Sequence, residues 1–267
     1  MKHLSLVAVF FAITFSLTAC SDDDGDFLVG GGDNPESSSS KSVKSSSSRK
    51  KGEDVVLGEM TDERDGRVYK TWKYRGLELM AENLNYRYLQ PTESLDSSSF
   101  CYNDSIKYCE KYGRLYLWSA AVDSAGLLNS DGEGEGFMVP SSVKYPVHGV
   151  CPDGWHLPSE YEWKALREVV DDGRDLRTVD DWEMGGGTDV YSFSVLPAGW
   201  RHGGRGEYVD IHEKGLFWSS TEHYYLGIVD GSEAAYLYFK QSDQTWEFFG
   251  MGYTIKSSAL SVRCIRD

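Results

Sequence analysis

The chain has 267 residues, with 42 aspartate and glutamate residues against 27 lysine and arginine residues, and a formal net charge of −15 at pH 7. A body this acidic is repelled by phosphate backbones, which argues against nucleic acid as a partner. Hydrophobic residues make up 40% of the chain and aromatic residues 13%. This composition fits one globular domain of about 200 residues, rich in short strands and turns, with shorter segments beside it.

Residues 1–19 have the pattern of a cleaved export signal. Lys2 supplies a positive charge, and the stretch from Leu4 to Leu17 is almost wholly apolar. As a helix this stretch would span about 21 Å, too short for a hydrocarbon core of about 30 Å, so it predicts a signal peptide rather than a membrane anchor. The segment ends in Leu-Thr-Ala-Cys, which resembles a bacterial lipobox. We therefore expect Cys20 to be acylated and to hold the protein on a membrane.

Residues 20–53 predict a lipidated, disordered tether. They begin with the acidic run 21–24 and contain the serine runs 37–40 and 45–48, so little here can bury a core. The acidic run resembles the surface-export signal of lipoproteins in Bacteroidetes-like bacteria; the alternative is a solvated acidic spacer. We expect an outer-membrane protein, anchored by lipid, whose residues 54–267 face the cell exterior.

Residues 54–267 predict one α+β domain with short antiparallel strands and one or two helices. Strands are expected on both sides of the turn Asp65-Gly66 and at several later places: 55–57, 67–72, 77–84, 112–118, 191–196, 216–218, 235–239 and 261–265. In 235–239, apolar residues alternate with two tyrosines, which is typical of a half-buried antiparallel strand.

The clearest helix begins after Pro158. Ser159 is a good N-cap, and Glu162 three residues later completes a capping box. An apolar stripe of helical spacing follows, formed by Trp163, Leu166, Val169 and Val170. A second, shorter helix is expected over 119–128.

Five cysteines are present, and lipidation of Cys20 leaves four, which allow three disulfide pairings. Cys101 and Cys109 lie close in sequence and suit a local staple. Cys151–Cys264 would then tie the start of the helical segment to the last strand. An exported chain meets oxidising conditions, which favours these bonds over free buried thiols.

Several ordered motifs carry a family resemblance, among them 65–71, 80–86, 112–116, 149–159, 187–189, 196–201, 217–222 and 261–264. They are similar to the Fibrobacter succinogenes major paralogous domain of secreted proteins and lipoproteins, over about residues 55–267. That resemblance implies no particular activity. The motifs 154–159, 218–222 and 262–264 also resemble the C-type-lectin-like fold shared with formylglycine-generating enzymes, which implies a compact domain whose termini meet in one sheet.

Enzyme signatures are missing from the sequence. There is no His-Glu-x-x-His, no Walker A loop and no Gly-x-Ser-x-Gly elbow. The formylglycine-generating enzymes need a reactive cysteine pair near the C-terminus, where this chain has only Cys264. We therefore expect a protein that is not an enzyme and holds no organic cofactor.

A calcium site is one hypothesis for the segment 129–136. Oxygen donors alternate there with small residues: Asn129, Asp131, Glu133 and Glu135. The alternative is a mobile acidic loop. The Glu-Pro-Asn, Gln-Pro-Asp and Trp-Asn-Asp triplets of calcium-bridged lectin sites do not occur in the sequence.

Aromatic residues in glycine-rich or polar stretches are the candidate ligand-binding residues, since flat rings stack on sugars and anchor protein partners. They are Trp182, Trp200, Tyr208, Tyr224, Tyr225 and Trp246. The alternative for each ring is burial in the core. The resulting hypothesis is a non-catalytic surface binding or adhesion module, with plant-wall polysaccharide as its ligand. A structural or assembly lipoprotein that docks on another envelope protein is the alternative.

Overall fold

A computed structural model describes residues 50–89, 98–122, 145–225, 228–240 and 249–267, with the side chains of 224–231 excepted. These residues form two β-sheets with a few short helices, which confirms the predicted α+β class. Among the described residues, every helix is too short or too polar to cross a membrane. The predicted signal peptide and most of the tether lie outside the described residues.

The first sheet joins the two ends of the domain. Its order is β1-β2-β3-β13-β6 and all its pairs are antiparallel. Its strands are β1 (Val56–Asp62), β2 (Arg67–Tyr74), β3 (Leu77–Met80), β6 (Trp155–His156) and β13 (Ile265–Arg266). The last strand therefore lies between β3 and β6, and the termini of the domain meet in one sheet, as the resemblance implied.

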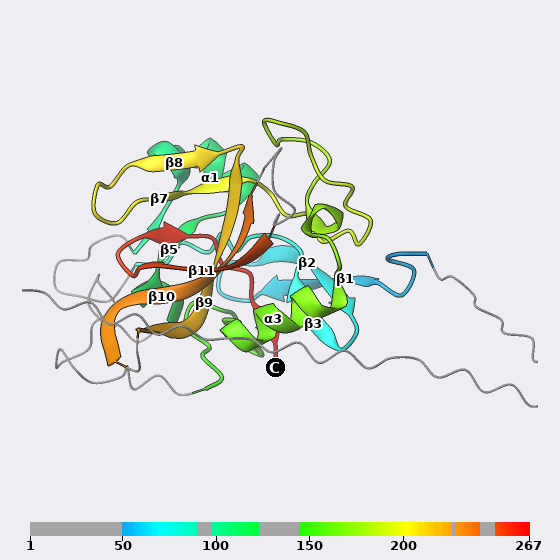
Figure 1. Cartoon of the computed structure of the whole chain (residues 1–267), viewed down its shortest axis with the longest axis horizontal. Coiled ribbons are helices and arrows are strands. Elements are labelled where there is room, and N and C mark those ends of the chain that lie inside the picture. The colour runs from blue at the N-terminus through cyan, green and yellow to red at the C-terminus, as the bar shows by residue number, and fades with distance from the viewer. Residues whose placement is uncertain (1–49, 90–97, 123–144, 226–227, 241–248) are drawn as a thin grey trace, which may run out of the picture. The chain divides into compact units, whose positions relative to one another are not determined.

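The second sheet has the order β11-β10-β9-β7-β12-β5-β4, with β8 paired to β7 (Figure 1). Its strands are β4 (Ser99–Phe100), β5 (Leu115–Leu117), β7 (Ala198–Arg201), β8 (Tyr208–Ile211), β9 (Lys214–Tyr225), β10 (Ile228–Lys240), β11 (Phe249–Ile255) and β12 (Ala259–Leu260). The pair β7–β9 is parallel, whereas β9, β10 and β11 form an antiparallel meander.

The described helices are α1 (Ile106–Tyr112), α2 (Trp118–Val122) and α3 (Glu160–Val169), with 3-10 turns η1 (Tyr102–Asp104) and η2 (Gly173–Leu176). The predicted capping box of α3 is confirmed. The Ser159 amide donates to Glu162 Oε2 at 2.7 Å, and the Glu162 amide donates to Ser159 Oγ at 3.3 Å. Trp163 and Leu166 are buried on the inner face of this helix.

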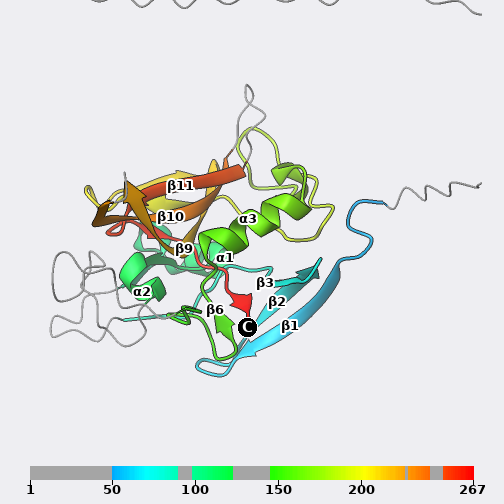
Figure 2. The same cartoon turned by 60° about the horizontal axis from the view of Figure 1, so that its bottom comes forward.

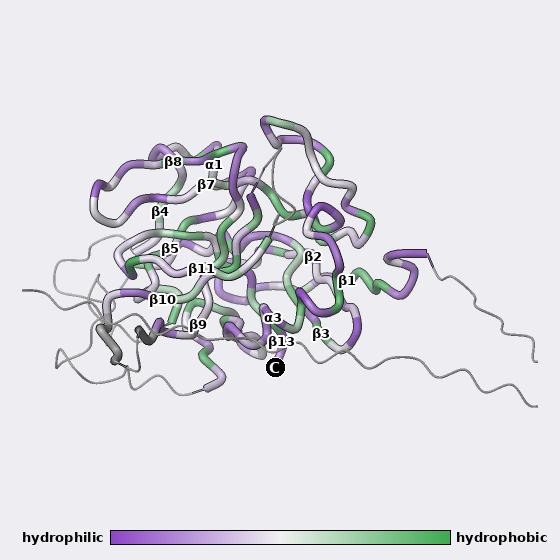
Figure 3. Tube along the Cα trace, viewed as in Figure 1, coloured by the Kyte–Doolittle hydropathy of each residue, from purple (hydrophilic) through white to green (hydrophobic). Residues whose placement is uncertain are grey.

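Helix α3 lies between the two sheets (Figure 2). Its buried residues share one core cluster with Trp72 of β2 and Phe239 of β10. Figure 3 shows hydrophobic stretches on the inner strands and hydrophilic stretches in the β7–β8 hairpin. The opposite face of β9 and β10 packs against a second core cluster, which includes Trp118 of α2 and Trp218 of β9.

Four fully buried tryptophans connect segments that are distant in sequence. Each indole N–H donates to a main-chain carbonyl: Trp72 to Tyr191, Trp118 to Ser219, Trp163 to Trp218, and Trp218 to Tyr116, at distances of 2.7–3.1 Å. A buried indole needs such an acceptor. These bonds fix how the sheets and α3 pack against one another.

Several sequence expectations differ from the structure. The strand expected over 77–84 ends at Met80. The stretch 191–196 is not a strand, because Ser192 and Ser194 adopt left-handed φ angles of 55° and 56°. The strand expected over 112–118 is limited to 115–117, since residue 112 ends α1, a helix that the sequence reading missed. The strand expected over 261–265 is instead Ile265–Arg266. For the helix expected over 119–128, α2 covers the first residues and 123–128 lie outside the described residues.

Candidate functional site

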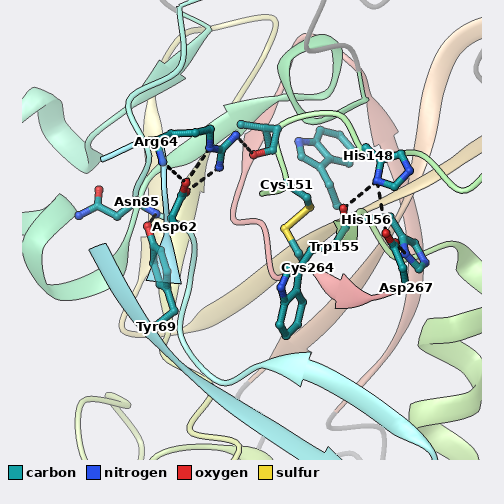
Figure 4. The surroundings of a disulfide bond; sticks show 12 residues. Asp62, Arg64, Tyr69, Asn85, His148, Cys151, Trp155, His156, Cys264 and Asp267 are labelled. Carbon is teal, nitrogen blue, oxygen red and sulfur yellow. Dashed lines mark hydrogen bonds and ion pairs between the residues drawn. A yellow bond between two sulfur atoms is a disulfide. The ribbon is translucent and has the colours of Figure 1, made fainter. Parts of the chain in front are cut away.

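Both predicted disulfides are present. Cys101–Cys109 spans 8 residues with a Cα–Cα distance of 5.0 Å, and Cys151–Cys264 spans 113 residues with a distance of 5.9 Å. The second bond joins the segment before β6 to the segment before β13 (Figure 4). It therefore reinforces two neighbouring strands of the first sheet.

An arginine fixes the β1–β2 turn beside this disulfide (Figure 4). Arg64 donates from Nε and Nη2 to the two carboxylate oxygens of Asp62, at 2.8 and 2.7 Å. Its Nη1 donates to the Val150 carbonyl at 2.8 Å, and its guanidinium lies 4.0 Å from the centre of the Tyr86 ring. Every part of this guanidinium has a structural partner, so we assign it no ligand.

His156 is held between two carboxylates. Its Nδ1 lies 2.8 Å from Asp267 Oδ1, and its Nε2 lies 2.9 Å from Glu162 Oε1 (Figure 4 shows the Asp267 side). Each ring nitrogen is therefore within hydrogen-bond distance of a carboxylate oxygen, one from Asp267 and one from Glu162. The ring links α3 to Asp267, and neither of its nitrogens is free to bind a metal or a nucleophile, so His156 has a structural role.

Within the part of the chain that the structure describes, no group of three or more His, Cys, Asp or Glu side chains is arranged to hold a metal ion. The predicted calcium ligands, Asn129, Asp131, Glu133 and Glu135, lie outside the described residues. The calcium site therefore stays a prediction.

The face of the second sheet opposite α3 carries a groove of about 290 Å³, which we call the aromatic groove. Its lining comes from three strands: Trp200 of β7, Lys214 and Leu216 of β9, and Tyr236, Tyr238 and Lys240 of β10. This set follows from the alternation of side chains between the two faces of a strand. Leu237 and Phe239 point to the α3 side, whereas Tyr236 and Tyr238 point to the groove. The half-buried strand predicted at 235–239 is thus confirmed.

Two glycines of β11 allow the tyrosine rings to lie across the sheet. Gly250 is the cross-strand partner of Tyr238, and Gly252 is the partner of Tyr236. A Cβ atom would lie 2.7 Å from Tyr238 Oη at the first glycine and 2.7 Å from Tyr236 Cζ at the second. Any side chain there would push the rings away. The two ring centres are 6.4 Å apart, which makes a continuous aromatic surface.

Asp210 holds two of the side chains that line the aromatic groove, those of Trp200 and Lys214. Its Oδ2 accepts from the Trp200 indole at 2.8 Å and from the Lys214 ammonium at 2.8 Å. Asp210 itself has a left-handed φ of 60° in the β7–β8 hairpin, where β8 pairs back onto β7. One carboxylate therefore sets both an aromatic ring and a cation of the lining.

The six predicted aromatic residues do not form one cluster in the described structure. Trp200 lines the groove. Trp182 is only 5% exposed and donates from Nε1 to Thr178 Oγ1 at 3.1 Å, so it is a core residue and we correct that assignment. The side chains of Tyr224 and Tyr225, and all of Trp246, lie outside the described residues.

Tyr208 is half-buried in the β7–β8 hairpin and does not line the aromatic groove. Its hydroxyl donates to Asp104 Oδ1 at 2.5 Å, and its ring centre lies 5.3 Å from that of Tyr102. Burial, and then the neighbouring Asp104, raise the pKa of Tyr208. We read this residue as a link between β8 and η1.

Sequence reasoning missed Lys214, Tyr236, Tyr238 and Lys240. The signal for the tyrosines was present, because the alternation in 235–239 puts them on the exposed face of a strand. The sequence does not show the strand register. That register pairs the two tyrosines with Gly250 and Gly252, and it pairs the two lysines with each other.

Comparison with known proteins gives one match. No curated protein and no solved structure matches the chain. Residues 73–266 match the family described as the Fibrobacter succinogenes major domain. This match covers the second sheet, α3 and every residue of the aromatic groove, and it leaves out β1 and most of β2. The chain belongs to the Fibrobacter succinogenes major domain family.

Proposed function

We propose that this protein is a lipid-anchored, non-catalytic binding module of the outer membrane, and that its aromatic groove binds polysaccharide. The single observation that carries the proposal is the groove itself, in which three aromatic rings and two cations line one hollow on the sheet face opposite α3. Flat rings with polar edges suit the apolar faces and hydroxyl rims of sugar rings.

The lining supports binding rather than hydrolysis. Glycoside cleavage ordinarily needs a pair of carboxylates on either side of the scissile bond. No carboxylate residue is among the described lining residues of the groove. The neighbouring Asp210 is engaged by Trp200 and Lys214.

The same proposal places the disulfide-bonded domain outside the cytosol. Two disulfides suit an oxidising compartment, where such bonds persist. Acylation at Cys20 and display of the domain at the cell surface rest on the lipobox-like and acidic segments of the sequence.

We also propose a C-type-lectin-like relationship for the fold. Supporting features are the termini that meet in one sheet, the helix α3 that packs between two sheets, and the disulfide that ties the last strand to the segment before β6. This relationship carries no ligand with it.

The alternative, docking on another envelope protein, has its own observation. β1 is at the edge of the first sheet, and its residues Val56 and Leu57 are 61% and 58% exposed. An exposed apolar edge strand is a surface onto which another chain can add a strand.

A pull-down of the full chain with insoluble plant-wall polysaccharides, with and without EDTA, tests the proposal. We expect retention by polysaccharide, and a loss of about 10-fold or more in affinity on Trp200→Ala. Tyr161→Ala is the matched control, because Tyr161 is an exposed aromatic residue of α3 that does not line the groove.

Retention only by cell-envelope extracts, unaffected by Trp200→Ala, would favour the docking alternative. An EDTA-sensitive retention that survives Trp200→Ala would move the binding site to the predicted calcium segment. Near-ultraviolet circular dichroism of each variant checks that the domain is folded.

A further inference from the structure

We infer that the aromatic groove selects acidic sugar units, so that its ligand is a polysaccharide containing uronate residues. This inference rests on the proposed function and goes beyond it by naming the charge of the ligand. Three observations support it. They are the cross-strand register of Lys214 and Lys240, the different ion-pair partners of these two lysines, and the Tyr238 ring beneath the Lys240 ammonium.

Lys214 and Lys240 are direct cross-strand partners in the β9–β10 pair. Like charges at directly opposite positions destabilise a sheet. Two lysines at directly opposite positions are unexpected in a chain of net charge −15, because acidic residues outnumber basic residues. Positions that break a local stability rule concentrate at functional sites.

The two ammonium groups have different partners. Lys214 Nζ lies 2.8 Å from Asp210 Oδ2, so this cation is balanced by a carboxylate of the protein. Lys240 has no ion-pair partner among the residues that the structure describes. Besides Asp210, the carboxylate of Glu233 contributes negative potential at Tyr236, further along β10. The excess positive charge of the lining is therefore at Lys240.

The Lys240 ammonium lies 5.4 Å from the centre of the Tyr238 ring. A sugar ring that stacks on Tyr238 therefore has its rim close to this cation. A uronate carries its carboxylate on the rim of the ring, where it would accept a charge-assisted hydrogen bond from the ammonium. Neutral hexoses present a hydroxymethyl group at that position and gain only a neutral hydrogen bond.

Calorimetric titration of the full chain, purified in detergent, tests the inference. The probes are an oligogalacturonate and the same oligomer with its carboxylates methyl-esterified, which keeps the sugar rings and removes the charge. We expect the acid to bind roughly 10-fold more tightly than the ester. In about 1 M salt, where the screening length is about 3 Å, this preference should shrink.

The variant Lys240→Met should bring the affinities for acid and ester together, because the acid then loses its charge-assisted hydrogen bond. Lys107→Met is the matched control, since Lys107 is a lysine outside the groove whose ammonium likewise lies over a tyrosine ring, 4.8 Å from the centre of Tyr108. The comparison of acid with ester on the unmodified chain does not depend on any variant folding.

The outcomes separate the two proposals. Equal binding of acid and ester, or an acid preference that survives Lys240→Met, overturns the uronate inference and leaves the polysaccharide proposal standing. Absence of binding to both oligomers and to neutral plant-wall polysaccharides overturns both.

Discussion

The ammonium of Lys256 lies 3.2 Å from the carboxylate of Glu222, and their side chains are only 2% and 7% exposed. The same ammonium lies 4.3 Å from the centre of the Trp118 ring. This pair connects the segment after β11 to β9, close to the core cluster that contains Trp118 and Trp218. Both charges have left water, so each depends on the other.

Breaking this pair should be more harmful than removing it. We expect Glu222→Gln to lower the free energy of unfolding by about 3–5 kcal/mol, because it removes the Glu222 charge that lies beside the buried Lys256 ammonium. The double variant Glu222→Leu with Lys256→Met should lose less than the single variant. Urea unfolding followed by tryptophan fluorescence measures both, and a double variant that is less stable than Glu222→Gln would contradict the prediction.

The two disulfides should differ in their contribution to stability. On the chain-entropy account, a bond that closes a longer loop restricts the unfolded chain more. We expect loss of Cys151–Cys264, by paired serine substitution, to cost about 5 kcal/mol, and loss of Cys101–Cys109 about 2.5 kcal/mol. The measurement is urea unfolding of the two paired-serine variants against the oxidised parent. An equal cost would show that native-state strain or residual structure dominates over loop length.

Tyr69 predicts a pH dependence at alkaline pH. Burial raises the pKa of Tyr69 from 10.0 to about 12, even though the Asn85 amide donates to its hydroxyl oxygen. The unfolded chain therefore loses this proton at lower pH than the folded chain does. The stability that the neutral hydroxyl provides is fully present below pH 10 and is lost as pH rises through about 12.

We expect Tyr69→Phe to flatten the fall in unfolding free energy between pH 10 and pH 12, by an amount of order 2–3 kcal/mol. Tyr161→Phe is the control, because that ring is 81% exposed. Urea titrations at a series of pH values provide the measurement. A slope that Tyr69→Phe leaves unchanged would assign the alkaline dependence to other buried tyrosines, such as Tyr116, whose pKa burial also raises.

Gly252→Ala tests whether the groove needs the tyrosine rings where they lie. The added methyl group would meet Tyr236 Cζ at 2.7 Å, so the ring must move. Such overpacking costs about 1–3 kcal/mol of stability, and we expect weaker polysaccharide binding with it. Gly204→Ala is the matched control, since its Cβ would meet only His202 at 3.6 Å. Full binding by Gly252→Ala would remove Tyr236 from the site.

Local features of this domain were predictable from the sequence. The capping box of Ser159 and Glu162 determines where α3 begins, and it acts within three residues. The turn Asp65-Gly66 between β1 and β2 is equally local, as Gly66 has a φ of 73°. The alternation in 235–239 is a period-2 pattern, which is typical of a half-buried strand.

The stretch 191–196 shows why a pattern alone was insufficient. Tyr191, Phe193 and Val195 are buried and the serines between them are more exposed, as in a strand. The backbone is nevertheless not extended. Ser194 donates from its amide and its hydroxyl to the Asp189 carboxylate, and these side-chain bonds replace those of a sheet ladder.

The aromatic groove could not be predicted because it depends on which strands pair and on the register in which they pair. Trp200 joins it only because β7 pairs in parallel with β9, at Gly199 and Gly215. Lys214 and Lys240 become neighbours only through the β9–β10 pairing. The sequence shows these residues far apart and gives no sign of which strand edges meet.

The position of β13 has a consequence for how the domain is made. Residues 265–266 supply the strand between β3 and β6, so the first sheet stays in two pieces until β13 is in place. A ribosome makes this strand after all the other described strands. Termination before residue 265 would leave β3 and β6 with open edges, which marks such copies for proteolysis.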